Sequence, residues 1–514
     1  MNLRGQNRQL AINMIAQLVS FAVNFGISFV LTPYIVKTIG KEAYGFVGLA
    51  NNFVSYATIL TTALNSMAGR FITIFIHRDD FENANKYMSS VFWANVLVSL
   101  ILVVPTVYCL ISMSSLIQIP NKLLGDVTIL WTCLFANFLI GNITSVFSVS
   151  TFVSNRLDIQ SVTGIISNIV RAAFLVAVYY IFDAKVWYMG ASTILCSILG
   201  ISVNVYCTKK MLPSIHIQRK QFDFSCIRHL IASGIWNSVT KISSILSNGL
   251  DLLITNIFIS TAAMGSISLA KNLPTYILSF LGSVSAVFAP QLTISYAKNN
   301  YDDIKRQLKS AINILGFISC IPITVMYAYG DIFFSLWVPG QDAQLLQLLG
   351  VISSLAFPFV LPLEPLWNIF TITDKVKQSS IFLIINSILT IVIVFIFLNF
   401  ARSDFVKMLI IVGISTIFSI IRALFFLPIY GAKCLHFKWS TFYPPVLKSF
   451  VVTIILTALS IGLRKIFVIN SWLTLLIACF ITAAISVVIN YFILLNHDER
   501  SFLKRKIFKK KGNL

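Results

Sequence analysis

Charged residues are scarce in this sequence, and acidic ones are the scarcest. Only 11% of the 514 residues are charged, with 18 Asp and Glu and 5 His, while 57% are hydrophobic. An ordinary water-soluble domain carries about 25% charged residues. The mean hydropathy of +0.85 agrees with this imbalance. The composition excludes a water-soluble globular protein and indicates a chain whose solvent is lipid.

The motifs that carry chemistry or bind metals are also missing. The eight cysteines stand alone, without a CxxC pair or a neighbouring histidine cluster. The sequence contains no glycine-rich nucleotide loop and no nucleophile elbow. We therefore predict a protein that is not an enzyme and that needs no cofactor and no metal.

Long apolar runs dominate what is present. A spanning helix needs about 20 mostly apolar residues, and runs of that kind predict an all-α integral membrane protein of about 14 spans. The first run follows a basic N-terminus and is too long for a signal peptide, so we predict an uncleaved first span. The expected spans are 10–36, 43–69, 87–112, 127–151, 160–182, 186–208, 229–258, 264–290, 309–330, 345–371, 379–400, 405–430, 447–465 and 472–495.

The basic residues set the expected orientation. Most of the 39 Lys and Arg fall on alternate loops and on the C-terminal tail, and cytoplasmic loops carry such an excess. This predicts that both termini are cytoplasmic. It also explains the net charge of +21 without nucleic-acid binding, because the charge is spread over many loops.

An internal repeat divides the chain. Residues 43–90 align without a gap with residues 263–310, and an offset of six spans keeps the orientation. We predict two six-helix lobes related by a parallel repeat, at 1–210 and 211–432, then two additional helices at 433–495 and a basic tail at 496–514. The identical pairs are Ala43/Ala263, Gly45/Gly265, Leu49/Leu269, Ala50/Ala270, Asn52/Asn272, Tyr56/Tyr276, Thr73/Thr293, Ile74/Ile294 and Ser90/Ser310.

Polar side chains at helical spacing mark four of the expected spans, the first, second, seventh and eighth. Hydroxyl groups at such positions often bond only their own helix, whereas an ionised side chain in the bilayer usually faces protein or water. Arg171 has the alternative of pairing with a carboxylate, and Arg422 that of reaching the membrane surface. The candidate substrate-binding residues are Lys241, Lys271, Arg171, Arg422, Asn24, Asn51, Asn237, Asn248 and Asn272.

Two acids, Asp251 and Glu364, lie within expected spans. They are candidates for ion coupling, or they balance the buried cations. Pro358, Pro362 and Pro365 remove helical hydrogen bonds around Glu364, so the tenth span should bend. The bend fits either a hinge or a packing feature.

The stretch FVLTPYIVKTIGKEAYGFVGLANNFVSY and the inner loop RDDFENANK, echoed by YAKNNYDDIKR, resemble the polysaccharide-biosynthesis flippases. These are the Wzx-type members of the multidrug, oligosaccharidyl-lipid and polysaccharide exporter superfamily. The resemblance covers most of the chain, and its motifs are degenerate.

The resemblance implies a flippase in the bacterial inner membrane. It would move undecaprenyl-pyrophosphate-linked oligosaccharides for O-antigen, capsule or exopolysaccharide. Its partners would be membrane lipids, a polysaccharide polymerase and glycosyltransferases. The cations would hold the pyrophosphate. The alternatives are a cation-coupled multidrug or metabolite exporter, disfavoured because the first span has no acidic residue, and a peptidoglycan-precursor flippase, disfavoured because that span has no arginine.

Overall fold

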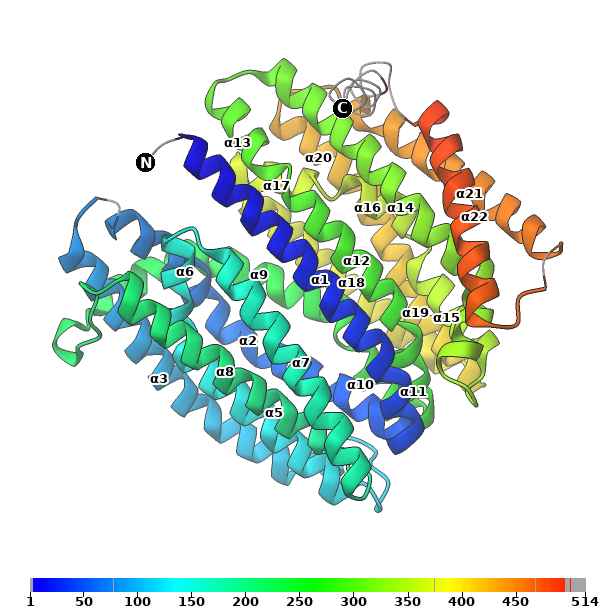
Figure 1. Ribbon diagram of the computed structural model, residues 1–514, viewed down its shortest axis with the longest axis horizontal. Coiled ribbons are helices and arrows are strands. Elements are labelled where there is room, and N and C mark those ends of the chain that lie inside the picture. The colour runs from blue at the N-terminus through cyan, green and yellow to red at the C-terminus, as the bar shows by residue number, and fades with distance from the viewer. Residues whose placement is uncertain (1–2, 77, 374, 467, 495–499, 501–514) are drawn as a thin grey trace, which may run out of the picture. The chain divides into compact units, whose positions relative to one another are not determined.

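The chain is helical throughout its described part. The computed structural model describes residues 3–76, 78–373, 375–466, 468–494 and 500, and every regular element in these ranges is a helix (Figure 1). This confirms the predicted all-α fold.

Two compact units divide the chain. The first contains Met1–Ser268 together with Leu383–Ile388, and the second contains Leu269–Phe382 together with Leu389–Leu514. The predicted lobe boundaries stay a prediction. Apart from residue 500, the predicted basic tail at 496–514 lies outside the described residues.

The first unit contains the helices up to α10 and most of α11. They are α1 (Leu3–Ile39), α2 (Lys41–Ile76), α3 (Phe81–Ile111), α4 (Met113–Leu116), α5 (Leu124–Thr144), α6 (Val149–Val153), α7 (Leu157–Ile181), α8 (Tyr188–Met211), α9 (Phe224–Asn248), α10 (Asp251–Phe258) and α11 (Thr261–Ala270).

The second unit contains the remaining helices, except for the six residues of α18 that belong to the first unit. They are α12 (Asn272–Ala286), α13 (Ala289–Ala297), α14 (Tyr301–Trp337), α15 (Ala343–Ser354), α16 (Phe357–Leu363), α17 (Leu366–Ile372), α18 (Val376–Phe400), α19 (Asp404–Ile421), the π-helical turn η3 (Arg422–Phe426), α20 (Leu427–Cys434), α21 (Tyr443–Arg464) and α22 (Trp472–Ile493).

Eleven helices of the described chain are long and apolar enough to cross a membrane, or twelve when α15 to α17 count as one bent span. The protein is therefore a multi-pass membrane protein, although a count of about 14 is not confirmed. The two expected spans that do not qualify are 229–258 and 264–290. The first is split at Gly249 and carries a lysine, and the second is divided into three short helices.

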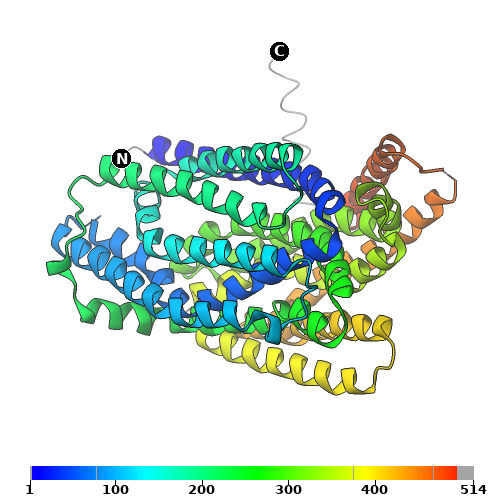
Figure 2. The same cartoon turned by 90° about the horizontal axis from the view of Figure 1, so that it is seen from below.

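Helix α2 runs through the first unit and packs against α1, α3, α5 and α9. Its residues Phe46, Leu49 and Ile72 are fully buried. Helices α5, α7 and α8 form a neighbouring layer, and they lie together in both Figure 1 and Figure 2. This layer leaves one face of α1 against α7.

The α1 and α7 helices run in the same direction with a fixed register. The Ser20 hydroxyl lies beside Gly164, where an added Cβ would be 3.7 Å away. Further along, the rings of Tyr34 and Tyr179 meet edge to face at 6.2 Å. Because 14 and 15 residues separate these contacts on the two helices, each level of α1 has a defined partner level on α7.

Glycines allow α2 to approach α9 and α11 very closely. A Cβ on Gly234 would lie 2.0 Å from the Ala63 carbonyl oxygen, and one on Gly265 would lie 2.5 Å from the Lys41 carbonyl oxygen. Such distances do not occur for real Cβ atoms, so both positions require glycine.

A connector, residues 212–223, joins α8 to α9 along the surface of α3. The His216 amide donates to the Asn85 side chain at 2.7 Å, and the Gln218 amide donates to the Ser89 hydroxyl at 3.1 Å. The Asp223 amide donates to the Ser90 hydroxyl at 2.9 Å. Side chains of α3 therefore satisfy the connector's backbone amides, and the link is fastened to the helix.

Helix α14 is the core of the second unit, and α21 and α22 pack on it. Arg464 at the end of α21 donates to both the Asp331 carboxylate of α14 and the Ala328 carbonyl oxygen. The buried Tyr329 hydroxyl lies 3.1 Å from the Thr482 hydroxyl of α22. These contacts attach the last two helices to the second unit.

The tenth predicted span is broken, as its prolines predicted. The α15 helix and the α16–α17 segment meet at an angle of 46°. Glu364 lies at the junction between α16 and α17. A second irregularity is η3, where the helix widens and the Leu424 carbonyl oxygen accepts a hydrogen bond from the Tyr443 hydroxyl.

Candidate functional site

The candidate residues divide between the two units. The first unit carries Asn24, Asn51, Arg171, Asn237, Lys241, Asn248 and Asp251, and the second carries Lys271, Asn272, Glu364 and Arg422. The side chain of Asn248, at the end of α9, lies outside the described part of the structure. Asn51 is exposed on α2.

Lys241 lies on α9 beside the face that packs against α2. Ser238 on that face donates to the Ile59 carbonyl oxygen at 3.1 Å, and Asn237 donates to the Ser66 hydroxyl at 3.1 Å. The half-buried Lys241 ammonium follows one turn later and has no hydrogen-bond or ion-pair partner among the described residues. A cation within an apolar helix bundle and without a carboxylate partner is suited to an anionic ligand.

Asp251 begins α10, directly after the break in the seventh expected span. Its side chain is 4% exposed. It interacts electrostatically with Tyr56 of α2, whose hydroxyl donates to the Gly249 carbonyl oxygen at the end of α9. The positive end of a helix dipole favours an acid at this position. The position of Asp251 at the start of α10 therefore accounts in part for the presence of a buried acid here.

Arg171 and Asn24 lie along the contact between α7 and α1. The Nε atom of Arg171 and the Oδ1 atom of Asn24 are both buried without a hydrogen-bond partner among the described residues. Asn24 Nδ2 makes one long bond of 3.4 Å to the Ser20 hydroxyl. An unmet donor and an unmet acceptor in one helix pair are expensive unless something else satisfies them.

Glu364 and Arg422 are brought together in the second unit. They interact electrostatically without a direct ion pair between them. Each lies at a backbone irregularity, Glu364 between α16 and α17 and Arg422 at the first residue of η3. Charge balance by Arg422 is therefore an alternative to a coupling role for Glu364.

Lys271 and Asn272 lie at the junction of α11 and α12. Lys271 interrupts the helix, and the Thr275 amide and hydroxyl both donate to its carbonyl oxygen, at 3.0 and 2.7 Å. The side chains of Lys271 and Asn272 both make interactions of their own. Neither position was predicted to break a helix.

Several hydroxyl groups on the polar faces of the second and eighth expected spans donate hydrogen bonds within their own helices. Thr58 donates to the Ser55 carbonyl oxygen, and Thr62 donates to that of Thr58. Ser279 does the same with Thr275. The structure thus bears out the local bonding that competes with a ligand-binding role for these hydroxyls.

An amide cluster in the first unit was missed by the sequence analysis. Asn65, Asn95 and Asn142 from α2, α3 and α5 bond one another, and Asn142 also donates to Ser99 at 2.9 Å. Asn95 donates in addition to the Ser145 hydroxyl at 3.2 Å. Asn65 therefore faces its own unit's interior. In the sequence, the only feature that these three residues share is an asparagine side chain, and this alone does not indicate that they meet.

Acidic groups in the loops serve as helix caps. Asp80 accepts hydrogen bonds from the Asn83 side chain at 2.7 Å and its backbone amide at 3.1 Å, and these bonds hold the pKa of Asp80 below its usual value. Asp223 accepts from Ser225 in the same way, and its pKa is also lowered. The described residues contain no group of His, Cys, Asp and Glu that could hold a metal ion.

Comparison with known proteins identifies the chain's relatives. A family model described as polysaccharide biosynthesis protein matches residues 10–295. The chain is 25% identical to the uncharacterized membrane protein EpsK of Bacillus subtilis, over 98% of this chain and 99% of that protein. It is 21% identical to an Escherichia coli protein named as a candidate O-antigen transporter, over 74% and 88% of the two chains.

Solved structures share the fold. The lipid II flippase MurJ in an inward closed conformation matches with a TM-score of 0.65 and 17% identity, covering 95% of this chain and all of MurJ. An inward-facing multidrug transporter of the MATE family matches with a TM-score of 0.59 and 14% identity, covering 83% and 97% of the two chains.

Proposed function

Because the chain belongs to the polysaccharide biosynthesis protein family, we propose that it is a flippase for lipid-linked oligosaccharides. The substrate is an undecaprenyl-pyrophosphate-linked repeat unit of an O-antigen, capsule or exopolysaccharide. It moves from the cytoplasmic to the outer leaflet of the bacterial inner membrane by alternating access. The relative named for O-antigen transport supports this substrate class.

The observation that carries the proposal is the unpaired ammonium of Lys241. A pyrophosphate is a compact anion that attracts such a cation, and a charge-assisted hydrogen bond contributes about 1.5–3 kcal/mol. Lys271, in the second unit, is a separate candidate for phosphate binding. Asn237 lies one turn before Lys241 on α9, and Asn272 follows Lys271 at the start of α12; in this proposal both supply amide groups to the head of the substrate.

The basic loops support the proposed orientation in the membrane. Both termini are cytoplasmic in this proposal, since most Lys and Arg then lie on cytoplasmic loops. The chain therefore receives its substrate from cytoplasmic glycosyltransferases and delivers it to an outer-leaflet polymerase. Asp251 and Glu364 are the candidate coupling groups.

Flipping by the purified protein tests the proposal. Proteoliposomes would contain a fluorescent polyprenyl-pyrophosphate oligosaccharide, and the fraction accessible to a membrane-impermeant quencher is measured over time. K241A/K271A should slow flipping by about tenfold or more, the effect of losing one charge-assisted bond. K241R/K271R should retain activity, because the charge is kept.

The exposed Lys122, in the loop before α5, provides a matched control. K122A should flip at the wild-type rate. Wild-type activity in a correctly inserted K241A/K271A would reject the phosphate-binding role. Cation-driven efflux of dyes without flipping would support a multidrug exporter instead, and faster flipping of lipid II than of the oligosaccharide would support a peptidoglycan-precursor flippase.

A further inference from the structure

A pocket opens in the first unit between the connection from α3 to α5 and the turn from α10 to α11. Its volume is about 550 Å³, and ligand pockets typically measure about 300–1,000 Å³. Its lining consists of residues 114–120 together with Ile257 and Thr261, all of which belong to the first unit. We call it the loop pocket.

Asn256 of α10 fastens one wall of the loop pocket. Its side chain is fully buried. The Gln118 amide donates to Asn256 Oδ1 at 2.8 Å, and Asn256 Nδ2 donates back to the Gln118 carbonyl oxygen at 3.0 Å. Gln118 Nε2 also donates to the Ile257 carbonyl oxygen at 3.2 Å. Three hydrogen bonds thus fix the loop on α10, so the wall keeps its shape without a ligand.

The lining offers hydroxyl and amide groups but no charge. The hydroxyls of Ser114 and Thr261 have no hydrogen-bond partner among the described residues. Gln118 Oε1 is a further acceptor, and Ile119 and Pro120 add apolar surface. A pyrophosphate requires cationic partners, which this lining lacks. A sugar ring, with hydroxyls around its rim and C–H groups on its faces, matches the lining.

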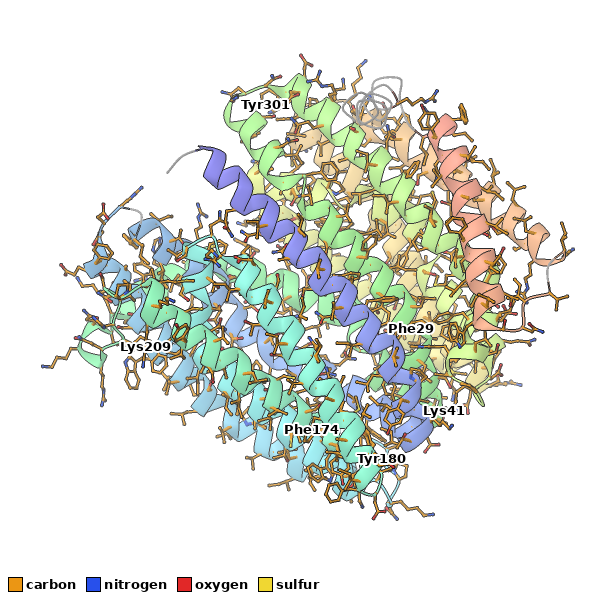
Figure 3. All side chains as sticks on the ribbon, viewed as in Figure 1. Phe29, Lys41, Phe174, Tyr180, Lys209 and Tyr301 are labelled. Atoms are coloured by element: carbon orange, nitrogen blue, oxygen red, sulfur yellow. The ribbon has the colours of Figure 1, made fainter. Side chains whose placement is uncertain are left out.

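The loop pocket lies at the end of the first unit that carries Lys41. Figure 3 labels Lys41, at the start of α2, and Tyr180, near the end of α7, at one end of this unit, and Lys209 of α8 at the other. Helix α3 follows α2 and runs back toward the Lys41 end, so the loop after α3 lies there. Helix α11 also meets this end, because a Cβ on Gly265 would lie 2.5 Å from the Lys41 carbonyl oxygen. In the orientation proposed above, this end faces outward.

We propose that the loop pocket is a release subsite, which binds a sugar of the glycan after the substrate has crossed the membrane. The inference rests on the proposed flippase function and deepens it. The Ser114 and Thr261 hydroxyls bond to sugar hydroxyls, and Gln118 Oε1 accepts from another. Neutral hydrogen bonds are weaker than charge-assisted ones, so the glycan is held briefly and can leave.

A cysteine reporter at Ser115 tests the subsite. Ser115 is exposed in the loop pocket, and its hydroxyl donates to the Ser112 carbonyl oxygen one turn earlier. Full-length S115C is labelled with a membrane-impermeant maleimide in right-side-out and in inside-out membrane vesicles. The labelling of the wild type, through its own eight cysteines, is subtracted. The reporter should be labelled in the right-side-out vesicles, because the pocket faces outward.

Two water-soluble probes then identify the ligand class. The first is the oligosaccharide released by mild acid from the host's own lipid-linked repeat units, and the second is inorganic pyrophosphate. The oligosaccharide should slow the labelling of S115C in right-side-out vesicles, because it covers the reporter. Pyrophosphate should leave the labelling rate unchanged, because the pocket has no cation.

Loss of the two unpaired hydroxyls should weaken this protection. In the S115C background, S114A/T261V should raise the oligosaccharide concentration for half-protection by about tenfold, as expected from two neutral hydrogen bonds. S114T/T261S keeps both hydroxyls and should match S115C alone. The exposed Thr132 of α5 lies outside the pocket and bonds its own helix, so T132V is the control and should also match.

Flipping by the same proteins in proteoliposomes separates the two proposals. Equal protection of S115C with and without S114A/T261V, or protection by pyrophosphate, would overturn the sugar subsite and leave the flippase proposal standing. Absence of protection by the oligosaccharide would have the same meaning. Labelling only in inside-out vesicles would reject a role in release. Absence of flipping by the wild type would reject the flippase proposal itself, whatever the labelling shows.

Discussion

Gly45 and Gly265, which the sequence alignment pairs at an offset of 220 residues, pack directly against each other. A Cβ on Gly45 would lie 3.1 Å from the Cα atom of Gly265. Both glycines belong to the first unit, and their contact brings α2 and α11 together.

Substitution of Gly265 should disturb this contact. In G265V the Cβ would meet the Lys41 carbonyl oxygen at 2.5 Å, so α2 and α11 must separate. We expect a loss of about 1–3 kcal/mol, as for other overpacked sites. The measurement is the thermal unfolding midpoint in detergent.

The matched control is Gly282 of α12, where a Cβ would meet nothing within 4 Å. G282A should be neutral or slightly stabilising, because alanine favours helix. Equal stability of G265V and wild type would mean that the close approach of α2 and α11 is absent in solution.

The amide cluster should contribute to the stability of the first unit. N95L removes the fully buried Asn95 and its side-chain hydrogen bonds to Asn65 and Ser145, although both residues keep hydrogen bonds to Asn142. Such losses cost about 1–3 kcal/mol. Denaturant unfolding measures the change. N168L serves as a control because the Asn168 amide bonds only its own helix, and an equal effect of both variants would refute a special role for the cluster.

The electrostatic interaction of Glu364 with Arg422 predicts that a second substitution restores the stability lost in R422A. R422A leaves the Glu364 carboxylate without its electrostatic partner, which costs about 3 kcal/mol when a buried charge is uncompensated. E364Q/R422A removes both charges and should recover most of the loss. Size-exclusion profiles and unfolding midpoints of the three proteins measure this, and a double variant as unstable as R422A would show that the two side chains are not coupled.

The helix cap at Asp80 should make the stability of the folded protein depend on pH. Hydrogen bonds from Asn83 lower the pKa of Asp80 in the folded state, so the carboxylate's contribution is complete above its unfolded pKa and disappears as the pH falls through the folded pKa. D80A should therefore lower the unfolding midpoint at pH 7 and matter less near pH 3. The adjacent exposed Asp79 supplies the control D79N, whose unfolding midpoint should stay near that of wild type at pH 7.

Hydropathy predicted the helical class and most spans, because burial in lipid requires long apolar runs. The prolines around Glu364 also predicted the bend in the tenth span. The breaks at Gly249 and Lys271 were not predicted, since neither residue alone ends a helix. Contacts with other helices determine where these two helices end. At the first break, for example, the Tyr56 hydroxyl donates a hydrogen bond to the Gly249 carbonyl oxygen.

The candidate site was predictable only as a set of residue types. Helical spacing placed Asn24 and Lys241 on polar stripes but gave no information about partners from other helices. Asn65 lies on the same polar face of the second expected span as Asn51. In the structure, however, it forms hydrogen bonds with Asn95 and Asn142 in the interior of the first unit.

The fastened connector between α8 and α9 means that covalent continuity is not what keeps these helices in place. Asn85, Ser89 and Ser90 would still bind the two ends of a chain divided between residues 216 and 217. Two genes encoding residues 1–216 and 217–514 should therefore yield complementary fragments that reassemble in one membrane.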